Sequence, residues 1–364
     1  HQRPVGLGPH ALDELDQVSQ LDSQDMHVQI ESLPDQLALA YELGLAQALP
    51  DWKNVRHLLI AGMGVSALCG DLLAAYLQPF APAPVTVHRD YGLPFWVRSE
   101  DVLVVVSSHS GNTEEVLEAF ETARSNGCRV LAISTGGELA KRATQANIPL
   151  WIFPHRGPSR PSLGYSFGFL LALAERIGLI PSQAHDISIA IEAMNHIQEH
   201  LRIDVPIVQN PAKREAGQLM GRWVTVVGTG ILAPVALRIK NQINTLARAS
   251  ANVEILPEAN HNAIAGLVQP TDVLMPHTMT LFLRASASSL HPRNLVRTEM
   301  TKMGLMMEGL NTDFLDARGD TPLAQIWTMI LFGDYLAYYL ALAYDIDPSG
   351  VGPVDDFKQM LPPR

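Results

Sequence analysis

Cysteine is scarce in this chain of 364 residues. The two that occur, Cys69 and Cys128, are too few for a disulfide framework, and their spacing does not fit a zinc site. The first residues also lack the apolar core of a signal peptide. We therefore expect a cytoplasmic protein with reduced thiols and no metal.

Basic residues are fewer than acidic residues in this chain. The chain has 26 Lys and Arg against 37 Asp and Glu, a net charge of -11 at pH 7, which disfavours a non-specific nucleic-acid surface. The most apolar segment, residues 326–344, carries Asp334 in its middle, so we expect a buried helix and no membrane partner. A hydrophobic content of 47% with 17% charged residues is typical of a globular chain, and the length allows two domains.

Strand-like hydrophobic runs alternate with helix-like stretches from residue 53 onward. The run 102–107 has no polar alternation, as expected of a parallel strand covered on both faces. The pattern of strand, Gly-x-Gly and helix at 55–74 starts again at 221–240. This predicts an α/β fold of two doubly wound, flavodoxin-like parallel sheets with helices on both faces.

The same pattern predicts where the parts of the chain begin and end. We expect an N-terminal helical segment at 1–52, a first domain that binds phosphate at 53–185, a second domain at 205–348, and a C-terminal helix at 349–364 that packs back near the site. The expected strands are 55–62, 85–88, 102–107, 129–134 and 149–153 in the first domain, and one within 221–240, then 252–256, 279–284 and 314–317 in the second.

The segment SSHSGNTEE (107–115) crowds four hydroxyl residues and a glycine between a buried strand and a helix. In an open parallel sheet, ligands bind beyond the carboxyl ends of the strands. A helix N-terminus there offers backbone N–H groups and partial positive charge, which suit a phosphate monoester. The simpler alternative is a capped helix, with Ser110 or Asn112 as the N-cap. One cap residue would be enough for that, so we favour an anion site.

Two further corners have a similar composition. AGMGVSA (61–67) closes the first strand, and STGGEL (134–139) follows the fourth, where its glycines could equally form a plain turn. GMGVSA also fits the Gly-x-Gly-x-x-Ala pattern of dinucleotide sites, with Asp90 as a late candidate for the acidic residue. A nicotinamide enzyme is therefore a less favoured alternative.

The ordered set of motifs is more specific than any one of them. AGMGVSALCGD, YGLPFWV, SSHSGNTEEVLEAF, SRPSLGY and LPEANHNAI occur in this order, followed by GDYLAYYLALAYDIDPSGV and DDFK. From about residue 50 to its end, the chain resembles the bifunctional phosphoglucose/phosphomannose isomerases of the sugar isomerase (SIS) domain superfamily. The resemblance implies two SIS domains and a homodimer with its sites at the subunit interface. The implied reaction interconverts the 6-phosphate of glucose or mannose with fructose 6-phosphate, without a metal or organic cofactor.

The resemblance also assigns roles to residues. It places the phosphate on Ser66, Ser108, Ser110 and Thr113, with Gly64 beside them. Arg160 corresponds to an arginine near the reacting carbons and Lys358 to a lysine near the ring oxygen. His261 corresponds to a histidine that opens the sugar ring and is supplied by the neighbouring subunit.

One position departs from the family pattern. Thr245 occupies the place of the glutamate that acts as the base in the family, and a threonine hydroxyl is a poor carbon base without an activator. Glu258, three residues before His261, is the best substitute, although it could equally be a solvated loop charge. We therefore expect a phosphosugar isomerase, with a catalytically silent phosphosugar-binding protein as the alternative.

Overall fold

The described chain divides into two compact units. The computed structural model describes residues 8–155, 157–350 and 352–362. Unit 2 is formed by residues 32–192, and unit 1 by the chain up to residue 31 together with the chain from residue 193 onward. The expected domains 53–185 and 205–348 fall inside these units, whereas the expected segment 1–52 is divided between them. The domain bounds themselves remain a prediction.

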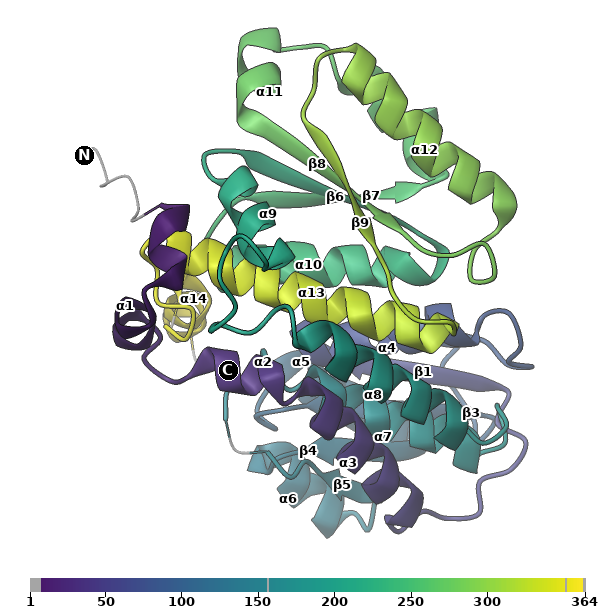
Figure 1. Cartoon of the computed structure of the whole chain (residues 1–364). Helices are drawn as coiled ribbons and strands as arrows, with labels where there is room; N and C mark the ends of the chain where they lie inside the picture. Colours follow the sequence, from purple (N-terminus) through teal and green to yellow (C-terminus); the bar gives the residue numbers. More distant parts are fainter. Residues whose placement is uncertain (1–7, 156, 351, 363–364) are drawn as a thin grey trace. The chain divides into compact units, whose positions relative to one another are not determined.

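Unit 2 is built on a five-stranded parallel sheet with the order β2-β1-β3-β4-β5, which is the flavodoxin-like order (Figure 1). Its strands are β1 (His57–Gly62), β2 (Val85–His88), β3 (Val102–Ser108), β4 (Arg129–Ser134) and β5 (Leu150–Ile152). Its helices are α3 (Leu33–Ala46), α4 (Gly64–Leu77), α5 (Glu114–Ser125), α6 (Gly137–Gln145) and α7 (Leu163–Arg176), and α8 (Ala184–Gln198) runs on into unit 1.

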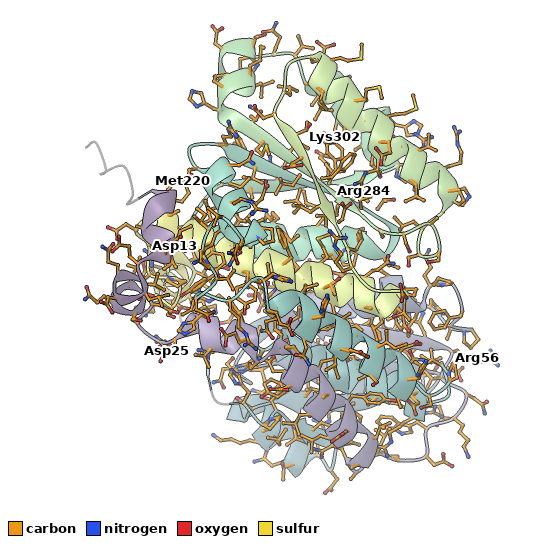
Figure 2. All side chains as sticks on the ribbon, in the orientation of Figure 1. Asp13, Asp25, Arg56, Met220, Arg284 and Lys302 are labelled. Carbon is orange, nitrogen blue, oxygen red and sulfur yellow. The ribbon has the colours of Figure 1, made fainter. Side chains whose placement is uncertain are left out.

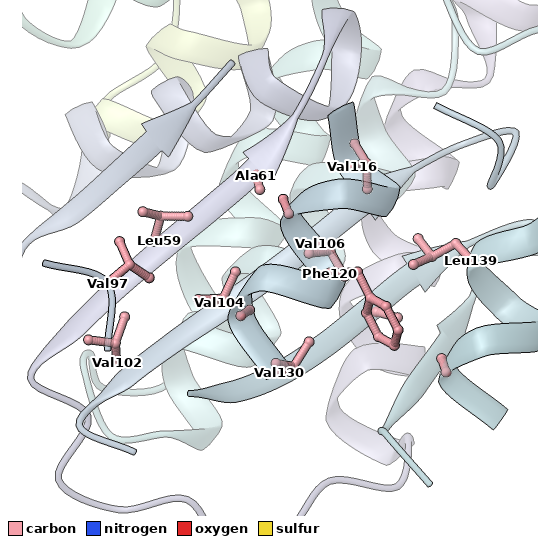
Figure 3. Close-up of a cluster of buried hydrophobic side chains, with 14 residues drawn as sticks. Leu59, Ala61, Val97, Val102, Val104, Val106, Val116, Phe120, Val130 and Leu139 are labelled. Carbon is pink, nitrogen blue, oxygen red and sulfur yellow. The ribbon is translucent and has the colours of Figure 1, made fainter. Parts of the chain in front are cut away.

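The core of unit 2 holds the strand ends in place. Every residue of β3 is buried, as its unbroken hydrophobic run predicts. Figure 3 shows Val104 and Val106 of β3 among the side chains of one buried cluster, together with Val116 and Phe120 of α5. Phe120 is fully buried, and truncating such a side chain costs about 3–5 kcal/mol. This packing fixes the start of α5 against the end of β3.

Unit 1 repeats the arrangement with four parallel strands in the order β7-β6-β8-β9. The strands are β6 (Trp223–Thr229), β7 (Ala251–Leu256), β8 (Thr278–Arg284) and β9 (Thr312–Asp316). The α-helices are α1 (Leu15–Leu21), α2 (Met26–Glu31), α9 (Pro211–Leu219), α10 (Ala233–Thr245), α11 (Thr271–His277), α12 (Pro292–Met307), α13 (Pro322–Ala343) and α14 (Pro353–Met360). The 3-10 turns are η1 (Pro9–Asp13), η2 (Gly230–Leu232), η3 (Glu258–His261) and η4 (Ala263–Gly266). The predicted restart of the pattern is confirmed.

Helix α13 is long and apolar enough to cross a membrane by length and composition, but 94% of its most apolar window is buried inside the structure. Asp334 in its middle is fully buried and receives two hydrogen bonds, of 2.9 and 2.7 Å, from the guanidinium of Arg238 in α10. A buried carboxylate needs such a partner, because an unpaired charge is costly in the interior. The expectation of a buried helix is confirmed.

The predicted strands agree with the structure better than the predicted connections do. β2 and β4 have the expected bounds, and β9 begins two residues earlier than expected. The stretch between the two expected domains contains most of α8, and α9 precedes the first strand of the second domain. Asn210 caps α9 by accepting the backbone N–H groups of Ala212 and Lys213, a signal that is present in the sequence as Asn before Pro.

Candidate active site

The carboxyl ends of β1, β3 and β4 lie at one edge of the unit 2 sheet, and each leads into a helix: α4, α5 and α6 respectively. Gly62 at the end of β1 is paired with Ser107 of β3, and Ser108 with Ser134 of β4. The strand order changes direction between β1 and β3, and such a switch point is where doubly wound sheets bind ligands. The hydroxyl segment 107–113 starts at the carboxyl end of β3 and therefore lies beside this switch point.

Residues 107–113, which we call the hydroxyl loop, are hydrogen-bonded to one another through side chains and backbone N–H groups. The Ser108 and Thr113 hydroxyl oxygens are 2.8 Å apart, and Ser108 Oγ also accepts the backbone N–H of Gly111 at 3.1 Å. Ser110 Oγ accepts the backbone N–H of Asn112 at 3.2 Å. Ser108 is buried, Thr113 is half-buried and Ser110 is exposed. The loop thus presents hydroxyls from its interior to its surface.

The start of α5 is not capped as the simpler alternative predicted. Its N-cap residue is Thr113, not Ser110 or Asn112, and the Thr113 side chain makes no capping hydrogen bond there. The Thr113 hydroxyl is instead directed to Ser108. A helix end without a side-chain cap keeps its partial positive charge available to a ligand. The capping prediction is wrong in this respect, and the geometry fits an anion site.

The loop after β4 braces the hydroxyl loop. The backbone N–H and the hydroxyl of Thr135 both donate to the His109 carbonyl, at 3.1 and 2.6 Å. Asn112 Oδ1 accepts the backbone N–H of Glu138 at 3.0 Å, so it caps α6 across the gap. A Cβ on Gly111 would lie 1.9 Å from the Gly136 carbonyl oxygen. The segment STGGEL is therefore more than the plain turn that its composition allowed.

Ser66 and Gly64 lie at the corresponding corner after β1. Gly64 begins α4 with a φ of +53°, a conformation that favours glycine. Ser66 is buried in the first turn of this helix, whose N-cap residue, Met63, also makes no side-chain cap. By contrast, Asp90 of the dinucleotide alternative is exposed, and it accepts the backbone N–H of Tyr91 at 2.8 Å.

Arg160 is half-buried in the segment between β5 and α7. This segment is linked to the hydroxyl loop through the imidazole of His109, which stacks on Phe153 and meets His155 edge to face. Burial, and then the neighbouring His155, lower the pKa of His109 to about 4. His109 is thus neutral at physiological pH and serves as an uncharged connection between the two loops.

The other predicted site residues lie in unit 1. Glu258 and His261 are the first and last residues of η3, which follows the carboxyl end of β7, and both are exposed. The buried Ala259 holds this turn against the core. Glu258 Oε1 accepts a hydrogen bond of 2.7 Å from Asn262 Nδ2. The structure therefore brings Glu258 and His261 together on one exposed turn.

Thr245 and Lys358 occupy a different part of unit 1. Thr245 ends α10, and its hydroxyl donates to the Asn241 carbonyl at 2.8 Å. Arg248, just beyond this helix, lies close to the backbone of Gly350, which precedes α14 and its exposed Lys358. β7 begins after this corner and ends at η3, and its six residues span about 20 Å. Figure 1 shows α14 and the arrowhead of β7 on opposite sides of unit 1.

The structure thus groups the predicted residues into three sets, two of them in unit 1. The phosphate-loop residues and Arg160 belong to unit 2, η3 carries Glu258 and His261, and the far end of α10 carries Thr245 near α14. Sequence reasoning missed Asn112 and Thr135 as the side chains that lock the loops together. A turn-forming Asn beside glycine was the only local signal for the first of them.

Comparison with known proteins identifies the family to which the chain is similar. Residues 53–150 match the SIS domain, and residues 208–361 match the bacterial phospho-glucose isomerase C-terminal SIS domain. A bifunctional phosphoglucose/phosphomannose isomerase of Caldicellulosiruptor bescii is 32% identical over 340 residues, which cover 92% of this chain and 98% of that protein. One from Aquifex aeolicus is 28% identical over 318 residues, 87% of this chain and 93% of that protein.

Solved structures agree on the fold. A glucose-6-phosphate isomerase like protein from Thermus thermophilus has a TM-score of 0.64 at 17% identity, covering 94% of this chain and 98% of its own. Tagatose-6-phosphate ketose/aldose isomerase from Escherichia coli has a TM-score of 0.62 at 16% identity, covering 89% and 94%. With two SIS domains and 32% identity along almost the whole chain, the protein belongs to the bifunctional phosphoglucose/phosphomannose isomerase family.

Proposed function

We propose that this protein is an aldose–ketose isomerase that interconverts glucose 6-phosphate, mannose 6-phosphate or both with fructose 6-phosphate. The observation that carries the proposal is the hydroxyl loop of unit 2. Ser108 and Thr113 pair at 2.8 Å at the start of α5, which has no side-chain cap. A phosphate monoester supplies acceptor oxygens for the backbone N–H groups and hydroxyls of this corner. Family membership supports the reaction class.

Each proposed residue has a chemical role in this reaction. The reaction moves a proton between adjacent carbons through an enediolate, so it needs a base, a group that opens the ring and a cation near the developing charge. We assign the phosphate to Gly64, Ser66, Ser108, Ser110 and Thr113, charge stabilisation to Arg160 and the ring oxygen to Lys358. His261 opens the ring, and Glu258 beside it acts as the base.

The separation within unit 1 supports a homodimer with shared sites. Lys358 is on α14, which follows Gly350 near the end of α10, whereas η3 with His261 follows the other end of β7, whose six residues span about 20 Å. This arrangement favours one copy of unit 1 supplying only one of the two residues to a given sugar. We propose that His261 and Glu258 reach the sugar from the neighbouring subunit, and that the dimer works in the cytoplasm, where the free thiols of Cys69 and Cys128 stay reduced.

A catalytically silent phosphosugar-binding protein is the second candidate, and Thr245 favours it. The Thr245 hydroxyl donates to a backbone carbonyl at 2.8 Å, which leaves it poorly placed to accept a proton from carbon. The two candidates differ in turnover, not in ligand binding.

An assay that couples fructose 6-phosphate production to a dye separates the candidates. We expect turnover of glucose 6-phosphate or mannose 6-phosphate, and saturable binding of fructose 6-phosphate by calorimetry. Saturable binding with no turnover would favour the silent protein, and the absence of both would refute the proposal.

Variants then test the base. Glu258→Gln should lower turnover by about 10²–10⁴-fold, as expected for the loss of positioned proton transfer, with little change in ligand affinity. Thr245→Ala should leave turnover nearly unchanged. The reverse pattern would exclude Glu258 as the base.

A further inference from the structure

Unit 1 contains a cavity of about 850 Å³ beside β9, bounded by α9, α13 and residues 193–201. Small-molecule sites typically have volumes of about 300–1,000 Å³. None of the residues assigned to the isomerase reaction lines this cavity. It therefore has no role in the proposed reaction.

A buried carboxyl group faces this cavity. Glu215 of α9 is 6% exposed, and its Oε1 atom is buried without a hydrogen-bond partner among the described residues. Burial, and then the charge of Asp313 on β9 and a side-chain hydrogen bond between the two carboxyl groups, raise the pKa of Glu215 to about 7. Leaving a buried polar atom unsatisfied costs about 1–3 kcal/mol. A ligand that donates a hydrogen bond to Glu215 would recover this free energy.

Two exposed arginines also line the cavity and carry positive charge. Arg214 and Arg318 line the cavity and are exposed, and no ion pair joins either of them to an acid in the described part of the chain. The Arg214 side chain donates to the Val208 carbonyl at 2.8 Å. The exposed imidazoles of His196 and His200 lie beside each other on the same lining. An anionic group would find several donors here.

The wall of the cavity is partly apolar. Leu201 and Met329 line it and are buried, and Leu315 of β9 adds a third such side chain. The ring of Phe314 on the same strand lies under the cationic groups of Arg284 and Lys302, which Figure 2 labels beside β9. Arg284 is paired with Asp316 and Glu299, so its charge is balanced within the protein. The lining thus combines the buried Glu215 and half-buried Asp313, an apolar wall, and the exposed Arg214, Arg318 and Asp316.

We propose that this cavity binds a small organic zwitterion, with a primary ammonium at Glu215 and Asp313 and a carboxylate or phosphate at Arg214 and Arg318. An ammonium has three donors, enough for the unpaired Oε1 atom and a second carboxylate oxygen. Guanidinium groups bind both kinds of anion through paired N–H donors. The short apolar body between the charges packs on the wall of the cavity. This site is independent of the proposed isomerase reaction.

The experiment is a calorimetric titration of the full chain with unbranched ω-amino carboxylates of about two to eight carbons, with fructose 6-phosphate present to occupy the phosphate loop. At least one chain length should bind saturably, and about 10-fold or more tightly than the amine or the carboxylate of the same length. That factor corresponds to one charge-assisted hydrogen bond. Failure of every member of the series to bind would overturn the proposal, whatever the isomerase assay gives.

Two variants assign the ends of the ligand. Glu215→Gln keeps the shape of the side chain and should remove the higher affinity of the amino carboxylate over the plain carboxylate. Glu199 is exposed and lies outside the lining, so Glu199→Gln should leave all affinities unchanged. Arg318 lies on the surface, so Arg318→Gln should not disturb the core. It should weaken the binding of the zwitterion and of the plain carboxylate by about the same factor. Unchanged affinity in both Glu215→Gln and Arg318→Gln would overturn the site.

Discussion

The two units share a strand order but differ at the helix that follows the third strand of each sheet. In unit 2, α5 begins at Thr113 without a side-chain cap. In unit 1, α12 is capped by His291, whose Nδ1 accepts the backbone N–H of Arg293 at 3.1 Å. Ser286 before α12 is also occupied, since it bonds to Gln325 and to Ser288, whereas Ser289 Oγ is buried without a hydrogen-bond partner among the described residues. The fold therefore supplies a place for an anion, and local hydrogen bonding decides whether that place stays available.

Two glycines set how closely the loops at this edge of unit 2 are packed. In unit 2, Gly111 and Gly137 have positive φ angles and approach the neighbouring loop so closely that a Cβ on either would clash with backbone. Only glycine allows both the positive φ angle and the close approach to the neighbouring backbone. This rigidity presents the amides and hydroxyls of the loop in a fixed arrangement, which preorganises it for a ligand.

The largest expected effect comes from breaking this packing. Gly111→Ala should lower the free energy of unfolding by about 3 kcal/mol or more and abolish fructose 6-phosphate binding, because it adds a backbone clash to an unfavourable φ. Gly127→Ala is the matched control, since Gly127 has the same φ of +71° with nothing within 4 Å of its Cβ position. It should cost only about 1 kcal/mol. Urea unfolding measures both, and equal losses would show that φ, not packing, restricts Gly111.

A second effect is expected in unit 1. The folded-state pKa of Glu215 is raised to about 7 from 4.5, so the charged form is disfavoured by folding, and stability is lost as pH rises from about 4.5 through 7. Glu215→Gln removes this cost. Its stabilisation should be about 2 kcal/mol larger at pH 8 than at pH 5, as measured by chemical denaturation in the absence of ligand. A pH-independent difference would contradict the raised pKa.

A third prediction tests the contrast between the two serine-rich corners. Thr113→Val keeps the shape of the side chain but removes its hydroxyl, and should weaken fructose 6-phosphate binding by about 10–100-fold, the range for a charge-assisted hydrogen bond. Ser286→Ala at the corresponding corner of unit 1 should leave the affinity unchanged. Calorimetry gives both values. Equal weakening by the two changes would mean that the capped corner also binds phosphate.

The smallest effect concerns the connection between the loops of unit 2. The pKa of His109 is lowered to about 4, so its neutral form is favoured by folding, and its contribution to stability is lost as pH falls from about 6.5 toward 4. Proton NMR should therefore find the His109 imidazole still neutral at pH 5.5. His109→Phe should bind fructose 6-phosphate within about 3-fold of the unchanged protein, since Phe retains the stacking on Phe153. A protonated His109 at pH 5.5 would contradict this.

Much of the fold could be read from local pattern. The hydrophobic runs within 102–107 and 129–134 predict strands because they are short, rich in Val, Leu and Ile, and bounded by polar residues. The hydroxyl corner was recognisable because its composition exceeds the needs of a helix cap. By contrast, the less favoured alternative named Asn112 as a cap of α5, whereas its side chain accepts the backbone N–H of Glu138, 26 residues away. Sequence spacing contains no information about such a contact.

Local sequence determined the alternation of strands and helices, the doubled architecture and the position of the hydroxyl loop, because hydrophobic periodicity and glycine placement act over a few residues. Tertiary structure alone decided that Gly136 closes on Gly111, that Arg248 lies close to Gly350, and that Glu215 faces a cavity beside Asp313. Each of these depends on which faces of distant segments meet. The free energy of burial that brings them together is summed over the whole chain, and no single segment encodes it.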